Sequence, residues 1–96
     1  AKDTRTLYGA EAKYLVALQL YKAHEYAAAE KEILNFIEQS TPHAYWLARS
    51  FILLSDVYVS MDKKLDARQY LLSLQQNYHA DDDIEQMINE RLEKLK

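Results

Sequence analysis

The stretch from Tyr45 to Met61, YWLARSFILLSDVYVSM, decides the fold, because no other part of the chain is so apolar over so many residues. Its apolar side chains recur at helical spacing on nearly every face, which predicts a helix covered by neighbours on several sides. At about 17 residues, and with Arg49 and Asp56 inside it, the stretch is too short and too charged to span a bilayer. We therefore predict that it is the central helix of a small domain.

The composition favours an all-α domain. The chain has 96 residues, a net charge of -3, one Gly, one Pro and no Cys. Neither sign of charge forms a long block, which disfavours a nucleic-acid binder. With so little Gly and Pro there is little material for hairpins or phosphate-binding loops, and without Cys there is no disulfide framework. These totals indicate one helical domain.

The remaining helices follow from the spacing of apolar residues. A first amphipathic helix is expected from Ala10, and its pattern loses phase near His24, where a tight turn leads into a second helix. Ser40-Thr41-Pro42 marks the next boundary, because Thr41 can cap the central helix and Pro42 fits its first position.

Two acidic stretches mark the later boundaries. The carboxylate of Asp62 is expected to cap a fourth helix that continues to Tyr78. The run Asp81-Asp82-Asp83 is expected to cap a fifth helix, from about Asp82 to Leu95, with one apolar stripe. Such a helix suits a terminal lid.

An internal repeat relates the two predicted helix pairs. The pattern in the second helix recurs 38 positions later in the fourth, and the first helix recurs in the third with the same offset. The superposed residues are Ala29, Ile33 and Phe36 on Ala67, Leu71 and Leu74, and Val16, Ala17 and Leu20 on Leu54, Ser55 and Tyr58. In each unit small side chains would let two antiparallel helices approach while large ones fill either side.

At these positions the chain resembles the tetratricopeptide repeat (TPR) family, a helix-turn-helix unit of roughly 34 residues that stacks into a superhelix. The positions that fit the family are Ala17 and Ser55, Tyr58, Ala29 and Ala67, and the turn aromatic Tyr26. The departures are Lys13 and Phe51 where Trp is common, Lys64 in place of a turn aromatic, and Thr41 or His79 in place of the closing Pro.

The resemblance covers about residues 10–78 and implies a tetratricopeptide-like α-α superhelix. Its parts would be the severed end of a preceding repeat or linker (1–9), repeat 1 (10–41), repeat 2 (42–79) and a C-terminal capping helix (80–96). The segment TPHAYWLARSFILLSDVY also resembles the C-terminal end of long repeat proteins from Bacteroidetes, which implies a periplasmic or envelope-associated parent.

Catalytic and metal-binding patterns are weak. His24-Glu25 begins like an HExxH zinc motif, but Ala28 stands where the second His is needed. The run of three Asp lacks the following Gly and the spaced oxygen ligands of a calcium loop. We therefore expect no enzyme, no cofactor and no metal. The alternative is a small helical metal-binding or enzymatic domain that uses His and Asp or Glu residues.

The resemblance also predicts a binding face, because the first helices of successive repeats line a concave groove in this family. By alignment the groove residues are Glu11, Tyr14, Leu18, Tyr21, Arg49, Ile52, Asp56 and Val59. Tyr14 and Leu18 occupy two places of the clamp that holds a C-terminal carboxylate in some members, which disfavours that ligand. We expect a non-catalytic scaffold for a protein or peptide partner, without nucleic acid or membrane insertion, that can self-associate through its exposed N-terminal repeat face.

Overall fold

The computed structural model describes residues 7–39, 43–80 and 82–95, and its regular structure in these ranges is entirely helical. The five helices are α1 (Leu7–Lys22), α2 (Tyr26–Glu38), α3 (Ala44–Ser60), α4 (Lys64–Asn77) and α5 (Ile84–Lys94). The predicted all-α class is therefore confirmed. Helix α1 begins three residues before Ala10, and the predicted cap at Thr41 and Pro42 lies outside the described residues.

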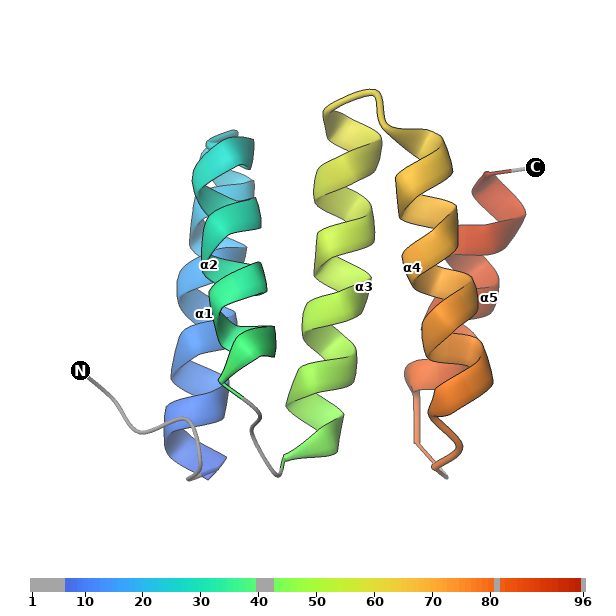
Figure 1. Ribbon diagram of the computed structural model, residues 1–96, viewed down its shortest axis with the longest axis horizontal. Helices are drawn as coiled ribbons and strands as arrows, with labels where there is room; N and C mark the ends of the chain where they lie inside the picture. The colour runs from blue at the N-terminus through green and yellow to red at the C-terminus, as the bar shows by residue number, and fades with distance from the viewer. Residues whose placement is uncertain (1–6, 40–42, 81, 96) are drawn as a thin grey trace.

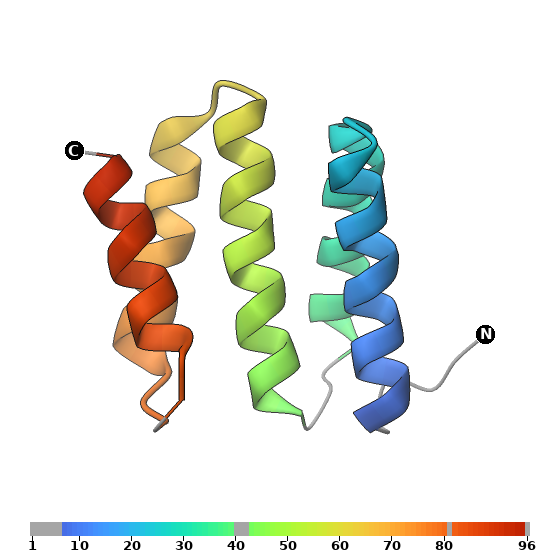
Figure 2. The ribbon, with the colours of Figure 1, turned by 180° about the vertical axis from the view of Figure 1, so that it is seen from behind.

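The helices form two antiparallel hairpins side by side, followed by one more helix. Helices α1 and α2 form the first hairpin and α3 and α4 the second, and α5 turns back along α4 (Figure 1). Seen from behind, α1 and α5 lie in front of α2 and α4 (Figure 2). Helix α3 packs against all four other helices. The prediction that the apolar stretch forms the central helix is therefore confirmed.

Each hairpin turns through the same backbone motif. His24 and Asp62 have positive φ angles of 63° and 61°. In the first turn the Glu25 N–H donates to the Leu20 carbonyl at 2.9 Å, and in the second the Lys63 N–H donates to the Tyr58 carbonyl at 2.7 Å. This pattern is the Schellman motif at the end of a helix. A residue in the left-handed conformation allows the N–H groups that follow the helix to donate to carbonyls of its last turn.

The second of these turns corrects one prediction. Lys63, not Asp62, is the residue that precedes α4, and α4 has no side-chain capping bond. Asp62 takes the left-handed position of the turn instead, which Asp tolerates better than most residues with a Cβ. Asp83 likewise precedes α5 without a side-chain cap, whereas Asp82 Oδ1 accepts the Ile84 N–H at 3.0 Å.

The core has two parts, one on each side of α3. Between the hairpins, Ala29 and Ile33 of α2 pack with Leu53, Leu54 and Val57 of α3. Under α5, the side chains of Ile84 and Ile88 cover a cluster that contains Ala48, Ile52, Leu71 and Leu74. Ala29 and Ala67 are both 0% exposed, so the predicted small positions of the second and fourth helices are confirmed as close-packing sites.

The two ends of the stack differ in polarity. Leu15 and Val16 of α1 are 45% and 48% exposed, whereas Leu53 and Leu54, 38 positions later in α3, are 3% and 0% exposed. The first hairpin covers this face of α3, but no other described element covers the same face of α1. At the opposite end the outer side of α5 is polar, with Glu85, Gln86, Asn89, Glu90 and Glu93 exposed.

Candidate protein-binding face

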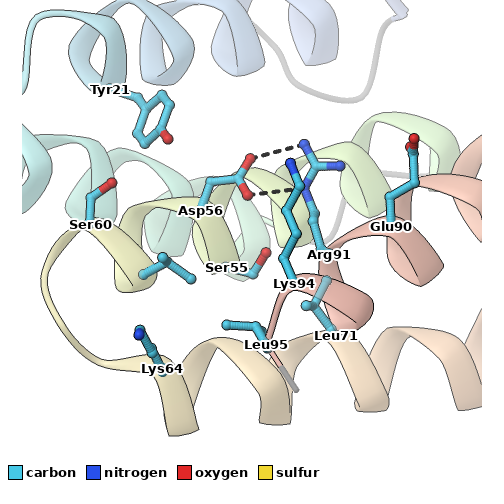
Figure 3. Close-up of a pocket in the computed structure, with 11 residues that line it drawn as sticks. Tyr21, Ser55, Asp56, Ser60, Lys64, Leu71, Glu90, Arg91, Lys94 and Leu95 are labelled. Atoms are coloured by element: carbon cyan, nitrogen blue, oxygen red, sulfur yellow. Dashed lines mark hydrogen bonds and ion pairs between the residues drawn. The ribbon is translucent and has the colours of Figure 1, made fainter.

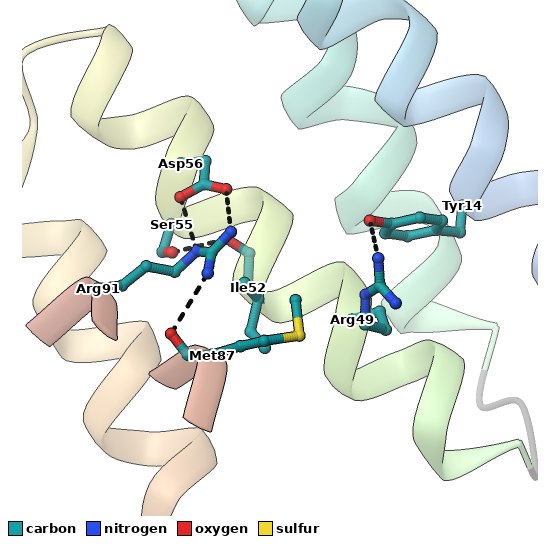
Figure 4. Close-up of polar contacts among 7 residues, drawn as sticks. All are labelled: Tyr14, Arg49, Ile52, Ser55, Asp56, Met87 and Arg91. Atoms are coloured by element: carbon teal, nitrogen blue, oxygen red, sulfur yellow. Dashed lines mark hydrogen bonds and ion pairs between the residues drawn. The ribbon is translucent and has the colours of Figure 1, made fainter. Parts of the chain in front are cut away.

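Helices α1, α3 and α5 together form one face of the molecule, with α2 and α4 behind them (Figure 2). Two polar contacts hold neighbouring helices of this face together (Figure 4). One joins Tyr14 of α1 to Arg49 of α3, and the other joins Asp56 of α3 to Arg91 of α5. All the residues in these contacts except Arg91 belong to the predicted groove.

Arg49 lies in an aromatic cradle between α1 and α3. Its Nη2–H donates to Tyr14 Oη at 3.1 Å and its Nη1–H donates to Tyr45 Oη at 3.0 Å. Its guanidinium carbon is 5.1 Å from the centroid of the Tyr14 ring and 6.0 Å from that of Trp46, which are cation–π distances. Tyr45 Oη in turn donates to Asp83 Oδ1 at 3.0 Å, so the cluster reaches the start of α5.

The contacts in this cradle favour the charged form of Arg49. Burial acts to lower its pKa, but the hydrogen bonds to Tyr45 and Tyr14 outweigh this effect, and the pKa of Arg49 is raised. Its Nε is buried and has no hydrogen-bond partner among the described residues. The guanidinium therefore joins α1 and α3 mainly through its two Nη groups and its contacts with the rings.

Asp56 and Arg91 form a two-point ion pair between α3 and α5. Arg91 Nε lies 3.0 Å from Asp56 Oδ1, and Arg91 Nη2 lies 3.0 Å from Oδ2. Arg91 Nη1 also donates to the carbonyl of Met87, at 3.3 Å, in the preceding turn of its own helix (Figure 4). Both side chains are about one quarter exposed, so the pair is screened less than a surface pair.

The predicted groove residues divide into buried and accessible ones. The side chains of Tyr14 and Ile52 are in the core rather than on an open surface, and Ile52 is covered because α5 lies across it. Leu18 and Tyr21 are partly buried against the inter-hairpin core, and Glu11 is partly exposed. Val59 is 37% exposed.

The accessible part of this face is a cavity of about 510 Å³ between the C-terminal halves of α3 and α5 (Figure 3). Three predicted groove residues, Tyr21, Asp56 and Val59, line it. The other lining residues are Ser55, Ser60, Lys64, Leu71, Glu90, Arg91, Lys94 and Leu95. Its volume lies within the ordinary range of ligand pockets, roughly 300–1,000 Å³.

The repeat pattern predicts none of the α4 and α5 residues that line this cavity as groove residues. The repeat alignment ends at the second hairpin, so it assigns no groove residue to the fifth helix. A signal is nevertheless present, because α5 follows α4 as α3 follows α2 and therefore occupies the place of a third first helix. Extending the alignment by one helix would place Met87, Glu90 and Lys94 at groove positions, and two of these, Glu90 and Lys94, line the cavity.

The titratable groups outside this face give no metal-binding cluster within residues 7–39, 43–80 and 82–95. The ring of His24 stacks on Tyr26 with centroids 5.7 Å apart, and His79 Nε2 lies 2.9 Å from the Gln76 carbonyl. Burial raises the pKa of Tyr58, with a further contribution from Glu30. Burial and a hydrogen bond to Asp82 raise the pKa of Tyr78 to about 12.

Two further findings bear on the class of protein. Over the part of the chain that the structure describes, no helix combines the length and the hydropathy that a membrane crossing requires. Comparison of the chain with protein-family models, with curated proteins and with solved structures finds no match.

Proposed function

We propose that the chain is a non-catalytic protein-interaction scaffold, in which two tetratricopeptide-like hairpins and a capping helix stack into a short superhelix. The observation that carries the proposal is the repetition of a whole hairpin. The Schellman turns at His24 and Asp62, and the buried alanines Ala29 and Ala67, all recur after 38 positions. Units that repeat and pack side by side are typical of solenoid proteins, whose usual role is to present an extended binding face.

The polar groups of the face support the same interpretation. Asp56 pairs with Arg91, and Arg49 donates to two tyrosine hydroxyls. These polar groups therefore connect helices and are not available as catalytic groups. The cavity beside them offers the ring of Tyr21 and the side chain of Val59, which suit the anchor residue of a peptide. We assign peptide or protein binding to this cavity.

The open end of the stack supports a second contact of the same kind. Leu15 and Val16 are exposed at positions where α3 carries the buried Leu53 and Leu54. Leu53 and Leu54 are covered by the side chains of the first hairpin. We therefore propose that a further hairpin, from a longer parent chain or a second copy, packs on α1 in the same way.

The test is selection of binders from a random peptide library displayed on phage, with the immobilised chain as bait. Val59→Trp would fill the cavity. Peptides selected on the unsubstituted chain should therefore no longer be enriched on this variant. Leu65→Trp is the matched control, because Leu65 is 72% exposed on α4 and does not line the cavity. Equal binding to both variants, or no enrichment at all, would refute the assignment. Metal retained in stoichiometric amount after chelation would instead favour the metal-binding alternative.

A further inference from the structure

We infer that the cavity between α3 and α5 takes an acidic peptide segment, with carboxylates against Lys64 and Lys94 and an adjacent apolar side chain against Val59 and Leu95. This inference rests on the proposed function and adds to it the chemistry of the partner. It follows from the charged groups in the cavity lining that do not pair with another residue in the described part of the chain.

Five charged residues line the cavity, and two of them neutralise each other. Asp56 and Arg91 form the two-point ion pair described above, with both contacts at 3.0 Å. The remaining charged groups are Lys64, Glu90 and Lys94, and no ion pair joins either lysine to another described residue. The cavity therefore keeps an excess positive charge in a chain whose net charge is -3.

The two lysines come from different helices. Lys64 is the first residue of α4, and Lys94 is the last residue of α5 (Figure 3). The helix dipoles do not add to this positive charge, because the positive end of α4 and the negative ends of α3 and α5 all reach the cavity. Figure 3 shows Lys94 beside the Asp56–Arg91 pair and Lys64 at the opposite end of the lining, so an extended segment could place one acidic side chain against each lysine.

The apolar part of the lining determines what accompanies the carboxylate. Val59 is 37% exposed, and Leu71, Leu95 and the ring of Tyr21 also line the cavity. A volume of about 510 Å³ accommodates a short stretch of peptide rather than a folded domain. A basic segment would find only Glu90 as an unpaired carboxylate among the described lining residues, and that residue is one turn from Lys94 on the same helix.

The test extends the phage selection by reading the composition of the enriched peptides. Three baits are compared: the parent chain, the double variant Lys64→Gln/Lys94→Gln, and the control Lys31→Gln/Arg68→Gln. The control removes two positive charges from exposed positions on α2 and α4 that do not line the cavity. Denaturation midpoints of all three baits establish that each is folded.

We expect peptides with Asp or Glu next to a large apolar residue to be enriched on the parent chain and on the control. A peptide synthesised from that consensus should bind the double variant roughly three- to thirtyfold more weakly, as expected for two partly exposed charge contacts, and bind the control as it binds the parent.

Other outcomes would overturn the inference and are distinguishable from one another. Peptides without an acidic preference that still lose binding to Val59→Trp would refute the acidic partner and leave the proposed scaffold intact. No enrichment on any bait would refute both. Acidic peptides that bind the double variant as tightly as the parent would place the anion elsewhere on the surface.

Discussion

Leu15 and Leu53 allow a direct test of the open end of the stack, because they are the same residue type 38 positions apart in α1 and α3. Leu53 is 3% exposed and packs in the core between the hairpins, whereas Leu15 is 45% exposed. Truncation to alanine removes the same atoms at both sites. Any difference in the free energy of unfolding therefore reports how far each site is covered by its neighbours.

The expected difference is large. Leu53→Ala removes a buried side chain and leaves a cavity, at a cost of about 2–5 kcal/mol. Leu15→Ala leaves no enclosed cavity and removes only about half as much buried apolar surface, so we expect a loss of about 1 kcal/mol. Against a total stability of about 5–15 kcal/mol for a typical domain, only the first change should shift the urea midpoint strongly.

The measurement is urea denaturation of both variants at low protein concentration, with the slope checked for constancy. Equal losses for the two variants at low concentration would refute the reasoning, because Leu15 would then be as well covered as Leu53. If a second copy packs on α1, the cost of Leu15→Ala should instead grow with protein concentration, since association stabilises the folded state by mass action. Sedimentation of the parent chain would show the same dependence.

Four further outcomes follow from particular contacts. His24→Gly should stabilise the fold by up to about 1–2 kcal/mol in thermal unfolding, because it relieves a left-handed residue with a Cβ. Ala67→Leu should lower the free energy of unfolding by about 1–3 kcal/mol through overpacking, measured by urea denaturation. Arg91→Met should cost about 1–2 kcal/mol in chemical denaturation, between a surface and a buried pair, because it leaves Asp56 unpaired. Stability contributed by Tyr78 should be complete below pH 10 and lost as the pH rises through about 12, with tyrosinate absorbance as the readout, because its pKa is higher in the folded chain.

Each of these outcomes has a control. Gln19→Gly, in the last turn of α1, should destabilise by up to about 1 kcal/mol where His24→Gly stabilises, and the same sign for both would contradict the turn geometry. Ala28→Leu at an exposed site should be near neutral, and a loss as large as that of Ala67→Leu would contradict the register. High salt should shrink the effect of Arg91→Met only modestly. Tyr78→Phe should remove the part of the tyrosinate titration near pH 12.

The helices and the inter-hairpin core could be predicted because they depend on spacing within short segments. Ala29 and Ala67 stand one turn from large residues, and that local pattern is sufficient to place both in close-packed positions. The role of Asp62 could not be assigned from its type alone. An Asp beside a helix can cap it or take a left-handed turn position, and the backbone hydrogen bonds of the turn select the second role.

The face was harder to predict because its accessible residues depend on where α5 docks. Ile52 has the spacing of a groove residue on α3, yet α5 covers it. Asp56 has the spacing of an exposed carboxylate, but a guanidinium 35 positions later in the chain reaches it. Such pairings depend on tertiary packing between helices, and residue types along one helix carry no direct signal for them.

The same long-range pairings explain how the hairpins keep their register. Tyr14–Arg49 joins α1 to α3, and the residues 38 positions later are Ile52 and Met87, which belong to one apolar cluster (Figure 4). Conversely, the residues 38 positions before Asp56–Arg91 are Leu18 and Leu53, which pack in the other cluster. Each interface therefore has one polar and one apolar contact, in opposite order along the helices.

This alternation disfavours misaligned stacking. If α5 slid by one turn along α3, Arg91 would face Ile52 in place of Asp56, and a partly buried guanidinium would lose its carboxylate. A similar slide of α3 along α1 would set Arg49 against Leu18 in place of Tyr14. A partly buried charge that faces an apolar side chain costs free energy, so a one-turn slide at either interface is disfavoured. These contacts fix the relative positions of α1, α3 and α5, which would lower the ordering cost of the proposed binding in the cavity.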